Sequence, residues 1–159
     1  MDLKTRNLSF PKVAFINVLL LLFASMLNAQ SPSDESRAGQ WRIAGQNLSN
    51  TWSQPTEHSI SPSNVKGLKT KWVFTTGGDV SATPTVAGGA VYFPDWAGNL
   101  FAINKQSGQL MWSHKISDYD GVAGAISRVS PAVDHDQLII GDILSARETH
   151  AGANVMAVD

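Results

Sequence analysis

Two stretches of the chain repeat each other, and this internal repeat restricts the possible folds more than any other feature. The run SATPTVAGGAVYFPD, residues 81–95, aligns with RVSPAVDHDQLIIGD, residues 128–142, at a constant offset of 47 residues. The following run NLFAIN, residues 99–104, aligns with NVMAVD, residues 154–159, at an offset of 55 residues, so the second copy contains eight additional residues. A unit of about 40–50 residues therefore occurs once in full and then begins again.

Each copy of the repeat has the pattern of short strands. From Trp41 onward, short apolar runs alternate with Gly, Pro, Asn, Asp and Ser, and no stretch keeps a helical period over three turns. A repeat of this length with four short strands is typical of one blade of a β-propeller. We therefore predict an all-β propeller whose first blade has strands at residues 83–87, 90–94, 100–104 and 109–115. The second blade is predicted to have strands at residues 130–134, 137–141 and 155–159.

The amino terminus has the pattern of an export signal. Lys4, Arg6 and Lys12 precede a nearly unbroken apolar run at residues 13–27, and the small residue Ala29 follows it. This run is short for a transmembrane helix, which needs about 20 residues. We expect residues 1–29 to be a signal peptide that is removed, with a retained membrane anchor as the alternative. The mature protein is then periplasmic or secreted, free of the membrane, and begins with a polar, flexible leader at residues 30–40.

The composition excludes several classes of protein. The chain has no cysteine, so it has no disulfide, no lipoprotein anchor and no C-x-x-C-H motif for haem c. Its formal net charge is −1, and removal of residues 1–29 takes away three basic side chains and one acidic side chain. A slightly acidic chain without a basic patch gives no indication of a nucleic-acid partner.

The segment AINKQSGQLMW, residues 102–112, joins the third and fourth predicted strands of the first blade. A tight hairpin turn needs a residue with positive φ, which Gly108 adopts without a steric penalty. The segment resembles the tryptophan-docking motif A-x-D-x-x-T-G-x-x-x-W of pyrroloquinoline-quinone-type propellers, with Asn104 in place of Asp and Ser107 in place of Thr. The final AVD of the chain matches the first three positions of the same motif. The resemblance implies that blades dock on their neighbours through Trp72, Ala102, Gly108 and Trp112.

The stretch before the first blade, residues 41–86, is similar to the amino-terminal part of quinoprotein alcohol dehydrogenases, in particular of polyvinyl-alcohol dehydrogenases. It departs from them at Trp52, where they usually have Arg, and at Ser81, where the larger enzymes have Glu. The resemblance covers residues 41–159 and implies a propeller of about eight blades. Residues 41–80 are then an opening segment with a ring-closing outer strand, and residues 81–159 form blade one and most of blade two. We accordingly interpret the chain as an amino-terminal fragment.

The predicted loops place the candidate site at one end of the blades. The turns after the first and third strands are tight, whereas residues 117–129 and the second-blade connection near residue 148 are long, and long loops on a rigid scaffold often carry function. The resemblance implies that Arg128 faces the carbonyls of a quinone, with a salt-bridged loop arginine as the alternative. Trp96 is expected either to cover the propeller face or to stack on a flat cofactor. Asp118 and Asp120 are either Ca²⁺ ligands or, more simply, solvated turn residues. The candidates at this end are Asp79, Ser81, Asp95, Trp96, Asp118, Asp120, Arg128, Asp142, Arg147, Glu148 and His150, of which Arg128, Ser81 and Trp96 are the predicted cofactor-binding residues.

The resemblance implies a periplasmic alcohol dehydrogenase that uses pyrroloquinoline quinone (PQQ) and Ca²⁺. Its substrate is expected to be a secondary alcohol or an alcohol polymer, and its electrons pass to a cytochrome or a quinone pool. No catalytic base can be identified in the sequence, so the fragment alone is expected to be inactive. Two alternatives stay open: a non-catalytic propeller scaffold for protein–protein interaction, like the outer-membrane assembly propeller that shares the docking motif, and a non-functional remnant of such a gene.

Overall fold

A computed structural model describes residues 39–143 and 152–159. All described residues belong to one compact unit, Ala38–Asp159. The predicted signal peptide and nearly all of the predicted leader lie outside the described residues, as do the candidates Arg147, Glu148 and His150. None of the helices in the described part has the length and apolar character needed to cross a membrane.

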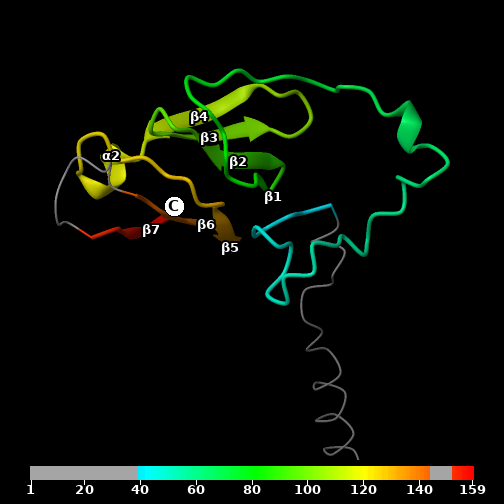
Figure 1. Ribbon diagram of the computed structural model, residues 1–159, viewed down its shortest axis with the longest axis horizontal. Helices are drawn as coiled ribbons and strands as arrows, with labels where there is room; N and C mark the ends of the chain where they lie inside the picture. Colours follow the sequence, from blue (N-terminus) through cyan, green and yellow to red (C-terminus); the bar gives the residue numbers. More distant parts are fainter. Residues whose placement is uncertain (1–38, 144–151) are drawn as a thin grey trace, which may run out of the picture. The chain divides into compact units, whose positions relative to one another are not determined.

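The first blade is a four-stranded antiparallel sheet in the order β1-β2-β3-β4 (Figure 1). Its strands are β1 Thr85–Ala87, β2 Ala90–Pro94, β3 Asn99–Asn104 and β4 Leu110–Lys115. The four predicted strands are thereby confirmed, and β2 has the predicted bounds. β1 begins later than expected, directly after Pro84, because a proline has no N–H to donate to a strand ladder.

The second blade has three described strands in the order β5-β6-β7. They are β5 Ala132–Asp134, β6 Gln137–Gly141 and β7 Val155–Val158, again antiparallel. β5 begins directly after Pro131, as β1 does after Pro84, so both copies of the repeat start their first strand in the same way. Two short helices occur within residues 39–143. η2 Val65–Gly67 lies in the opening segment. α2 Ser117–Asp120 lies in the long connection between the blades and is followed by Gly121, whose φ is 71°.

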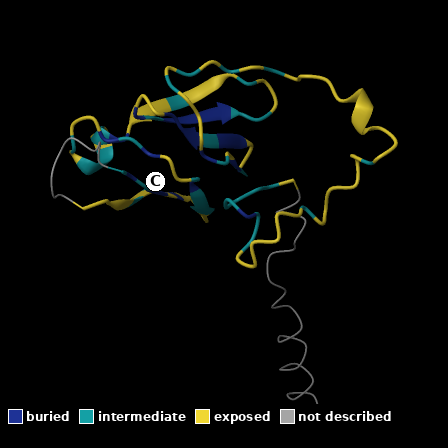
Figure 2. Cartoon of the chain, in the orientation of Figure 1, coloured by how far each residue is buried: buried dark blue, intermediate teal, exposed yellow. Residues whose placement is uncertain are grey.

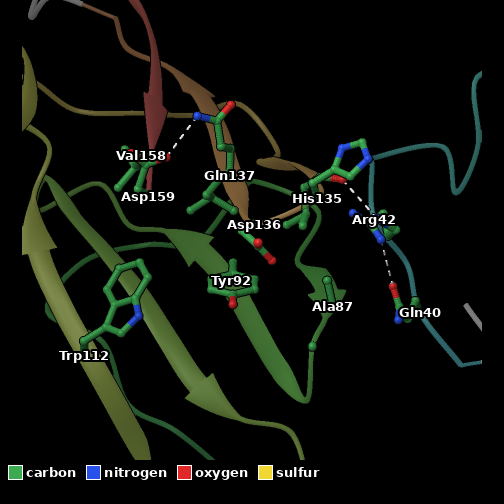
Figure 3. Close-up of a pocket in the computed structure, with 13 residues that line it drawn as sticks. Gln40, Arg42, Ala87, Tyr92, Trp112, His135, Asp136, Gln137, Val158 and Asp159 are labelled. Carbon is green, nitrogen blue, oxygen red and sulfur yellow. Dashed lines mark hydrogen bonds between the residues drawn. The ribbon is translucent and has the colours of Figure 1, made fainter. Parts of the chain in front are cut away.

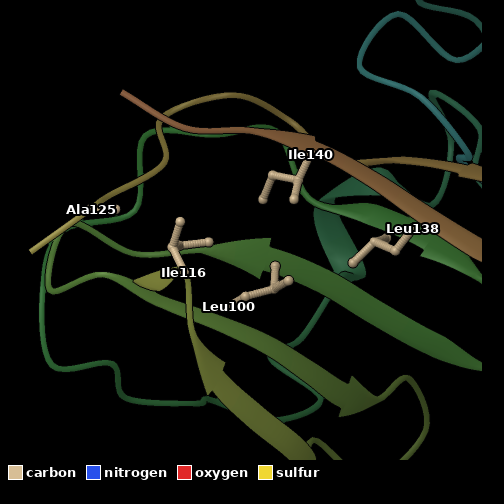
Figure 4. Packing of buried hydrophobic residues seen from close by; sticks show 5 residues of the cluster. All are labelled: Leu100, Ile116, Ala125, Leu138 and Ile140. Carbon is tan, nitrogen blue, oxygen red and sulfur yellow. The ribbon is translucent and has the colours of Figure 1, made fainter. Parts of the chain in front are cut away.

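The two blades pack face to face through a shared hydrophobic core (Figure 4). Leu100 of β3 and Ile140 of β6 are almost completely buried in this core, which we call the inter-blade core. Its buried members are Leu100, Ile116, Ala125, Leu138 and Ile140. Figure 2 shows the resulting concentration of buried residues in β2 and β3. Burial of these apolar side chains, at about 25 cal/mol per Å², is the main force that holds the blades together.

The first strands of the two blades lie side by side. The Thr83 N–H donates to Ser130 Oγ at 2.8 Å, and the Thr85 hydroxyl donates to the Pro131 carbonyl. Thr83 and Ser130 occupy equivalent positions of the repeat, so equivalent edges of the blades are neighbours, as around the axis of a propeller. The chain thus holds roughly two blades of a quinoprotein-type β-propeller.

The opening segment connects both first strands. Trp41 and Val86 exchange two backbone hydrogen bonds of 2.8 Å, and the Val133 N–H donates to the Arg42 carbonyl at 2.8 Å. Arg42 Nε donates back to the Val133 carbonyl at 3.0 Å. One short stretch of backbone therefore fixes β1 and β5 relative to each other.

Another part of the opening segment, residues 69–76, packs on the far face of blade one. From Lys71 to Thr76 its side chains are alternately exposed and half-buried, as in a strand, although no described strand pairs with it. Phe74 contacts Phe93 and Phe101 edge to face, at centroid distances of 6.2 and 5.5 Å. Trp72 Nε1 donates to the Lys105 carbonyl at 3.0 Å, and the indole lies on Gly108, where a Cβ atom would come within 2.6 Å of the ring. Trp72 thus covers the β3–β4 turn at the position where Gly108 has no side chain.

Candidate functional site

Three elements bring the predicted cofactor-binding residues together at one end of the blades. Ser81 precedes β1, Trp96 follows β2, and Arg128 lies in the connection that leads to β5. β2 ends at Pro94, and the next connection needs only a tight turn before β3 begins at Asn99. This turn projects Trp96 into the space between the two loops that carry Ser81 and Arg128.

Trp96 is the centre of the cluster. Its Nε1 donates to Ser81 Oγ at 2.9 Å, and its backbone N–H donates to the Asp79 carbonyl at 2.9 Å. The Arg128 guanidinium carbon lies 4.7 Å from the centroid of the indole, a cation–π distance. The three predicted residues, up to 47 positions apart in the sequence, therefore form one contiguous group, which we call the Trp96 cluster.

The Trp96 cluster lies open to solvent. Trp96 is 42% exposed, and Ser81 and Arg128 are exposed as well. Arg128 covers one face of the indole, and both side chains stay accessible to solvent. A fixed cation beside an aromatic surface suits a planar ligand with negative oxygens. Arg128 supplies a positive charge and Trp96 an aromatic surface, so the chemistry that the cluster offers is binding and charge stabilisation.

Two candidate carboxylates at this end have a structural role instead. Asp95 is fully buried, and its two oxygens accept hydrogen bonds of 2.9–3.0 Å from the backbone N–H and the side-chain amide of Asn99. Asp142 is 3% exposed and accepts from the backbone N–H and side-chain amide of Asn154. We call these pairs the Asp–Asn clamps. Each clamp closes the connection between the second and third strands of its blade, so neither carboxylate faces a ligand.

The two acids of α2 are also engaged locally. Asp118 accepts from the Lys115 N–H at 3.0 Å, and Asp120 accepts from the Val122 N–H at 2.7 Å through one oxygen. The other Asp120 oxygen has no partner within the described residues. Residues 39–143 and 152–159 contain no group of three or more His, Cys, Asp and Glu side chains that could hold a metal ion. Between these acids, the Tyr119 phenol is partly buried, which together with the charge of Asp118 raises its pKa above the ordinary value of 10.

A pocket of about 330 Å³ lies at the opposite end of β2 from the Trp96 cluster (Figure 3). Tyr92 and Trp112 form one wall, with ring centroids 6.0 Å apart, and the β5–β6 turn forms another. Gln137 Nε2 donates to Asp159 at its rim, at 2.9 Å. The sequence contains no indication of a site at this end of the blades, because the turns there are short. The pocket lies between the two blades, so it depends on how they pack and not on any single loop.

PQQ with Ca²⁺ needs more than the described residues supply. The Trp96 cluster provides one cation and one aromatic face and lies open to solvent, and both buried aspartates accept hydrogen bonds from asparagines. The described residues therefore do not form a complete site for the quinone and its metal.

The fold defines the chain as part of a β-propeller. Its two blades follow the same sequence repeat, their first strands lie side by side, and Trp72 covers the turn of blade one. The family model described as outer membrane protein assembly factor BamB, PQQ_2, matches residues 64–159. The chain belongs to this PQQ_2 family.

Several individual proteins are similar to parts of the chain. A polyvinylalcohol dehydrogenase of a Pseudomonas species is 30% identical over 83 residues, which are 52% of this chain. A tetrathionate hydrolase of Acidithiobacillus ferrooxidans is 32% identical over 66 residues, which are 42% of this chain. The matched stretch spans 13% of the length of each of these relatives. Among solved structures, a quinohemoprotein alcohol dehydrogenase from Pseudomonas putida HK5 is 28% identical, with a TM-score of 0.38, over 48% of this chain and 11% of that chain.

Proposed function

We propose that the chain forms the amino-terminal blades of a periplasmic PQQ-dependent alcohol dehydrogenase that oxidises secondary alcohols, such as those of polyvinyl alcohol. The observation that carries the proposal is the convergence of Ser81, Trp96 and Arg128 in one exposed cluster. The similarity to a polyvinylalcohol dehydrogenase over about half of the chain supports the substrate class. In this proposal the Trp96 cluster contributes one edge of the quinone site, and other blades supply the metal ligands and the catalytic base.

The role of Arg128 follows from its charge and position. An orthoquinone gains negative charge on its oxygens as it accepts a hydride, and a nearby guanidinium stabilises this charge. The indole of Trp96 holds the guanidinium in place from one side, and the Ser81 hydroxyl in turn holds the indole. Ser81 and Trp96 are thus positioning residues for the cation in this proposal.

Quinone binding can be tested directly on the purified chain. We expect PQQ to quench the tryptophan fluorescence of the chain, and R128A to weaken binding about 10–100-fold, since a hydrogen bond to a charged group contributes about 1.5–3 kcal/mol. R128K should restore part of the affinity, whereas K66A, which removes a distant exposed charge on η2, should leave it unchanged. No dye reduction with a secondary alcohol is expected from the chain alone. Quenching by PQQ that is equal in R128A and the unaltered chain would refute the role of Arg128.

A second candidate function is a non-catalytic scaffold for protein assembly at the outer membrane. The description of the matching family and the occupied state of both buried aspartates favour it. This function predicts that PQQ does not bind and that the chain co-purifies with components of outer-membrane assembly. Specific loss of PQQ binding in R128A, with no such co-purification, favours the dehydrogenase instead.

A further inference from the structure

The turn that carries Trp96 is packed closely against backbone on both of its sides. On one side, a Cβ atom added at Gly78 would lie 2.6 Å from the Ala97 nitrogen and 3.1 Å from the Trp96 carbonyl carbon. On the other side, a Cβ atom added at Gly98 would lie 2.8 Å from the Ala125 carbonyl oxygen. Cβ atoms in folded proteins essentially never come closer than 3.0 Å to such atoms, so both contacts need a residue without a side chain.

Each of these contacts joins the turn to a different partner of the indole. Gly78 lies in the loop that leads to Ser81, whose hydroxyl accepts from the Trp96 indole. Ala125 lies in the connection that leads to Arg128, whose guanidinium covers the indole. The two close approaches therefore set how near Ser81 and Arg128 can come to Trp96.

The loop on the first side is fixed to the turn by hydrogen bonds. The Trp96 N–H donates to the carbonyl of Asp79, the residue next to Gly78, at 2.9 Å. The Gly78 carbonyl in turn accepts from the Thr76 hydroxyl at 2.6 Å. The loop therefore cannot move away from the turn without losing the bond between Asp79 and Trp96.

The connection on the second side is anchored to blade two. Ser127 is 1% exposed, and its hydroxyl donates to the Gly141 carbonyl at 2.6 Å. The same oxygen accepts from the Val129 N–H at 3.4 Å, so the backbone is held on both sides of Arg128. Because of this anchor, the connection has little freedom to retreat from Gly98.

A methyl group added at either glycine would have to displace backbone. The atoms that it meets belong to the main chain, which gives way less easily than the end of a flexible side chain. Overpacking of this kind shifts the surrounding backbone. A binding site must be held within about 0.5 Å of its productive geometry, so such a shift is enough to separate the indole from its partners.

We propose that Gly78 and Gly98 are positioning residues of the Trp96 cluster. The first glycine sets the distance from the indole to Ser81, and the second sets the distance to Arg128. Their effect on quinone binding rests on the proposed function, whereas their effect on the geometry of the cluster does not. Close packing of this kind holds the cation in place before negative charge develops beside it.

NMR spectra of the isotope-labelled chain test the two roles separately and without PQQ. Arg128 protons that lie over the indole are shifted upfield by its ring current, and their loss in R128A assigns them. The indole N–H signal of Trp96, assigned by its loss in W96F, reports the hydrogen bond to Ser81. We expect G98A to return the Arg128 protons to the position of a free arginine. G78A should move the indole N–H signal to the position that it has in S81A.

Two other glycines provide matched controls. A Cβ atom at Gly77 meets nothing closer than 3.7 Å, an ordinary contact, so G77A should leave both signals unchanged. Gly124 has a φ of 77°, nearly the 78° of Gly98, but a Cβ atom there meets nothing within 4 Å. G124A thus adds the backbone strain without the clash and should also leave both signals unchanged. A merely structural role would lower stability but would not move one signal and spare the other.

The NMR spectra decide whether the glycines position the cluster. Arg128 protons that keep their shift in folded G98A, or lose it equally in G124A, would overturn the role of Gly98. An unchanged indole N–H signal in folded G78A would overturn the role of Gly78. Gly78 is outside the left-handed region, so G78A adds no such strain and tests the proposal even where G98A does not fold.

A PQQ titration tests the consequence for binding. We expect G98A to weaken binding about 10–100-fold, as R128A does, and R128A to add less than about twofold in a G98A background. G124A should bind PQQ as the unaltered chain does. Full additivity of G98A and R128A would overturn the link between this glycine and the cation. If the NMR signals respond as expected but no variant binds PQQ, the positioning role holds and the proposed function is wrong.

Discussion

The contact between Trp72 and Gly108 is predicted to contribute strongly to the stability of blade one, and G108A tests it. Gly108 has a φ of 71°, in the left-handed region. A Cβ atom there would lie 2.6–2.8 Å from three atoms of Trp72, a separation that atoms in folded proteins do not tolerate. The substitution therefore introduces backbone strain and also displaces the indole from the turn it covers.

The expected cost has two parts. An alanine in the left-handed region costs about 1–2 kcal/mol, and overpacking against a rigid side chain costs about 1–3 kcal/mol. Displacement of the indole also lengthens the 3.0 Å hydrogen bond from Trp72 to the Lys105 carbonyl. We expect G108A to lower the free energy of unfolding by about 3 kcal/mol in total.

Gly121 provides a matched control. It has the same φ of 71°, but a Cβ atom there meets nothing within 4 Å, so G121A should show the strain alone, about 1 kcal/mol. Urea unfolding at one fixed protein concentration measures both variants. With a slope of about 2 kcal/mol per M, the midpoint should fall by about 1.5 M for G108A and by about 0.5 M for G121A.

A double substitution separates the contact from the strain. In a W72A background the indole is absent, so G108A should cost no more than G121A does. If G108A and G121A are equally destabilising in the unaltered chain, or if W72A does not reduce the cost of G108A, the docking interpretation is wrong.

Three further outcomes follow from the described contacts. D95A should lower the free energy of unfolding by about 2–3 kcal/mol in urea titrations, because it leaves the amide groups of the partly buried Asn99 without an acceptor; no change would contradict the clamp. R42A should cost about 1 kcal/mol, because it removes one of the two bonds to Val133, and a larger loss in R42K than in R42A would contradict this. Tyr119 should ionise above its ordinary range in an ultraviolet titration, because burial raises its pKa in the folded protein. Its contribution to stability is therefore present below pH 10 and is lost as the pH rises through the folded pKa. Y119F should remove this pH-dependent loss of stability.

The strands were predictable from the sequence because their signals are local. Alternating apolar residues and bounding turns gave β2 and β6 with their observed bounds. The predicted first strand of each blade begins two residues before the observed one. The prediction included Pro84 and Pro131, but a proline has no N–H to donate to the strand ladder.

The packing of loops was only partly predictable. The sequence pointed to Ser81, Trp96 and Arg128 as residues at one end of the blades, but their mutual contact depends on the angle between blades, which no local pattern encodes. Asp95 and Asp142 were candidates only because of their predicted place at this end of the blades. The signal for their structural role was the asparagine that follows each of them at the start of the third strand, repeated in both copies.

The two Asp–Asn clamps show how this architecture tolerates added sequence. The partners are four residues apart in blade one and twelve residues apart in blade two, yet both pairs close the same connection. For a flexible loop, a threefold increase in length adds only about 1 kcal/mol of closure entropy. The clamp isolates the strands from whatever lies between its partners, so this position is a natural acceptor for inserted peptides, where an epitope, a binding loop or a sensor could be grafted without changing the register of the blade.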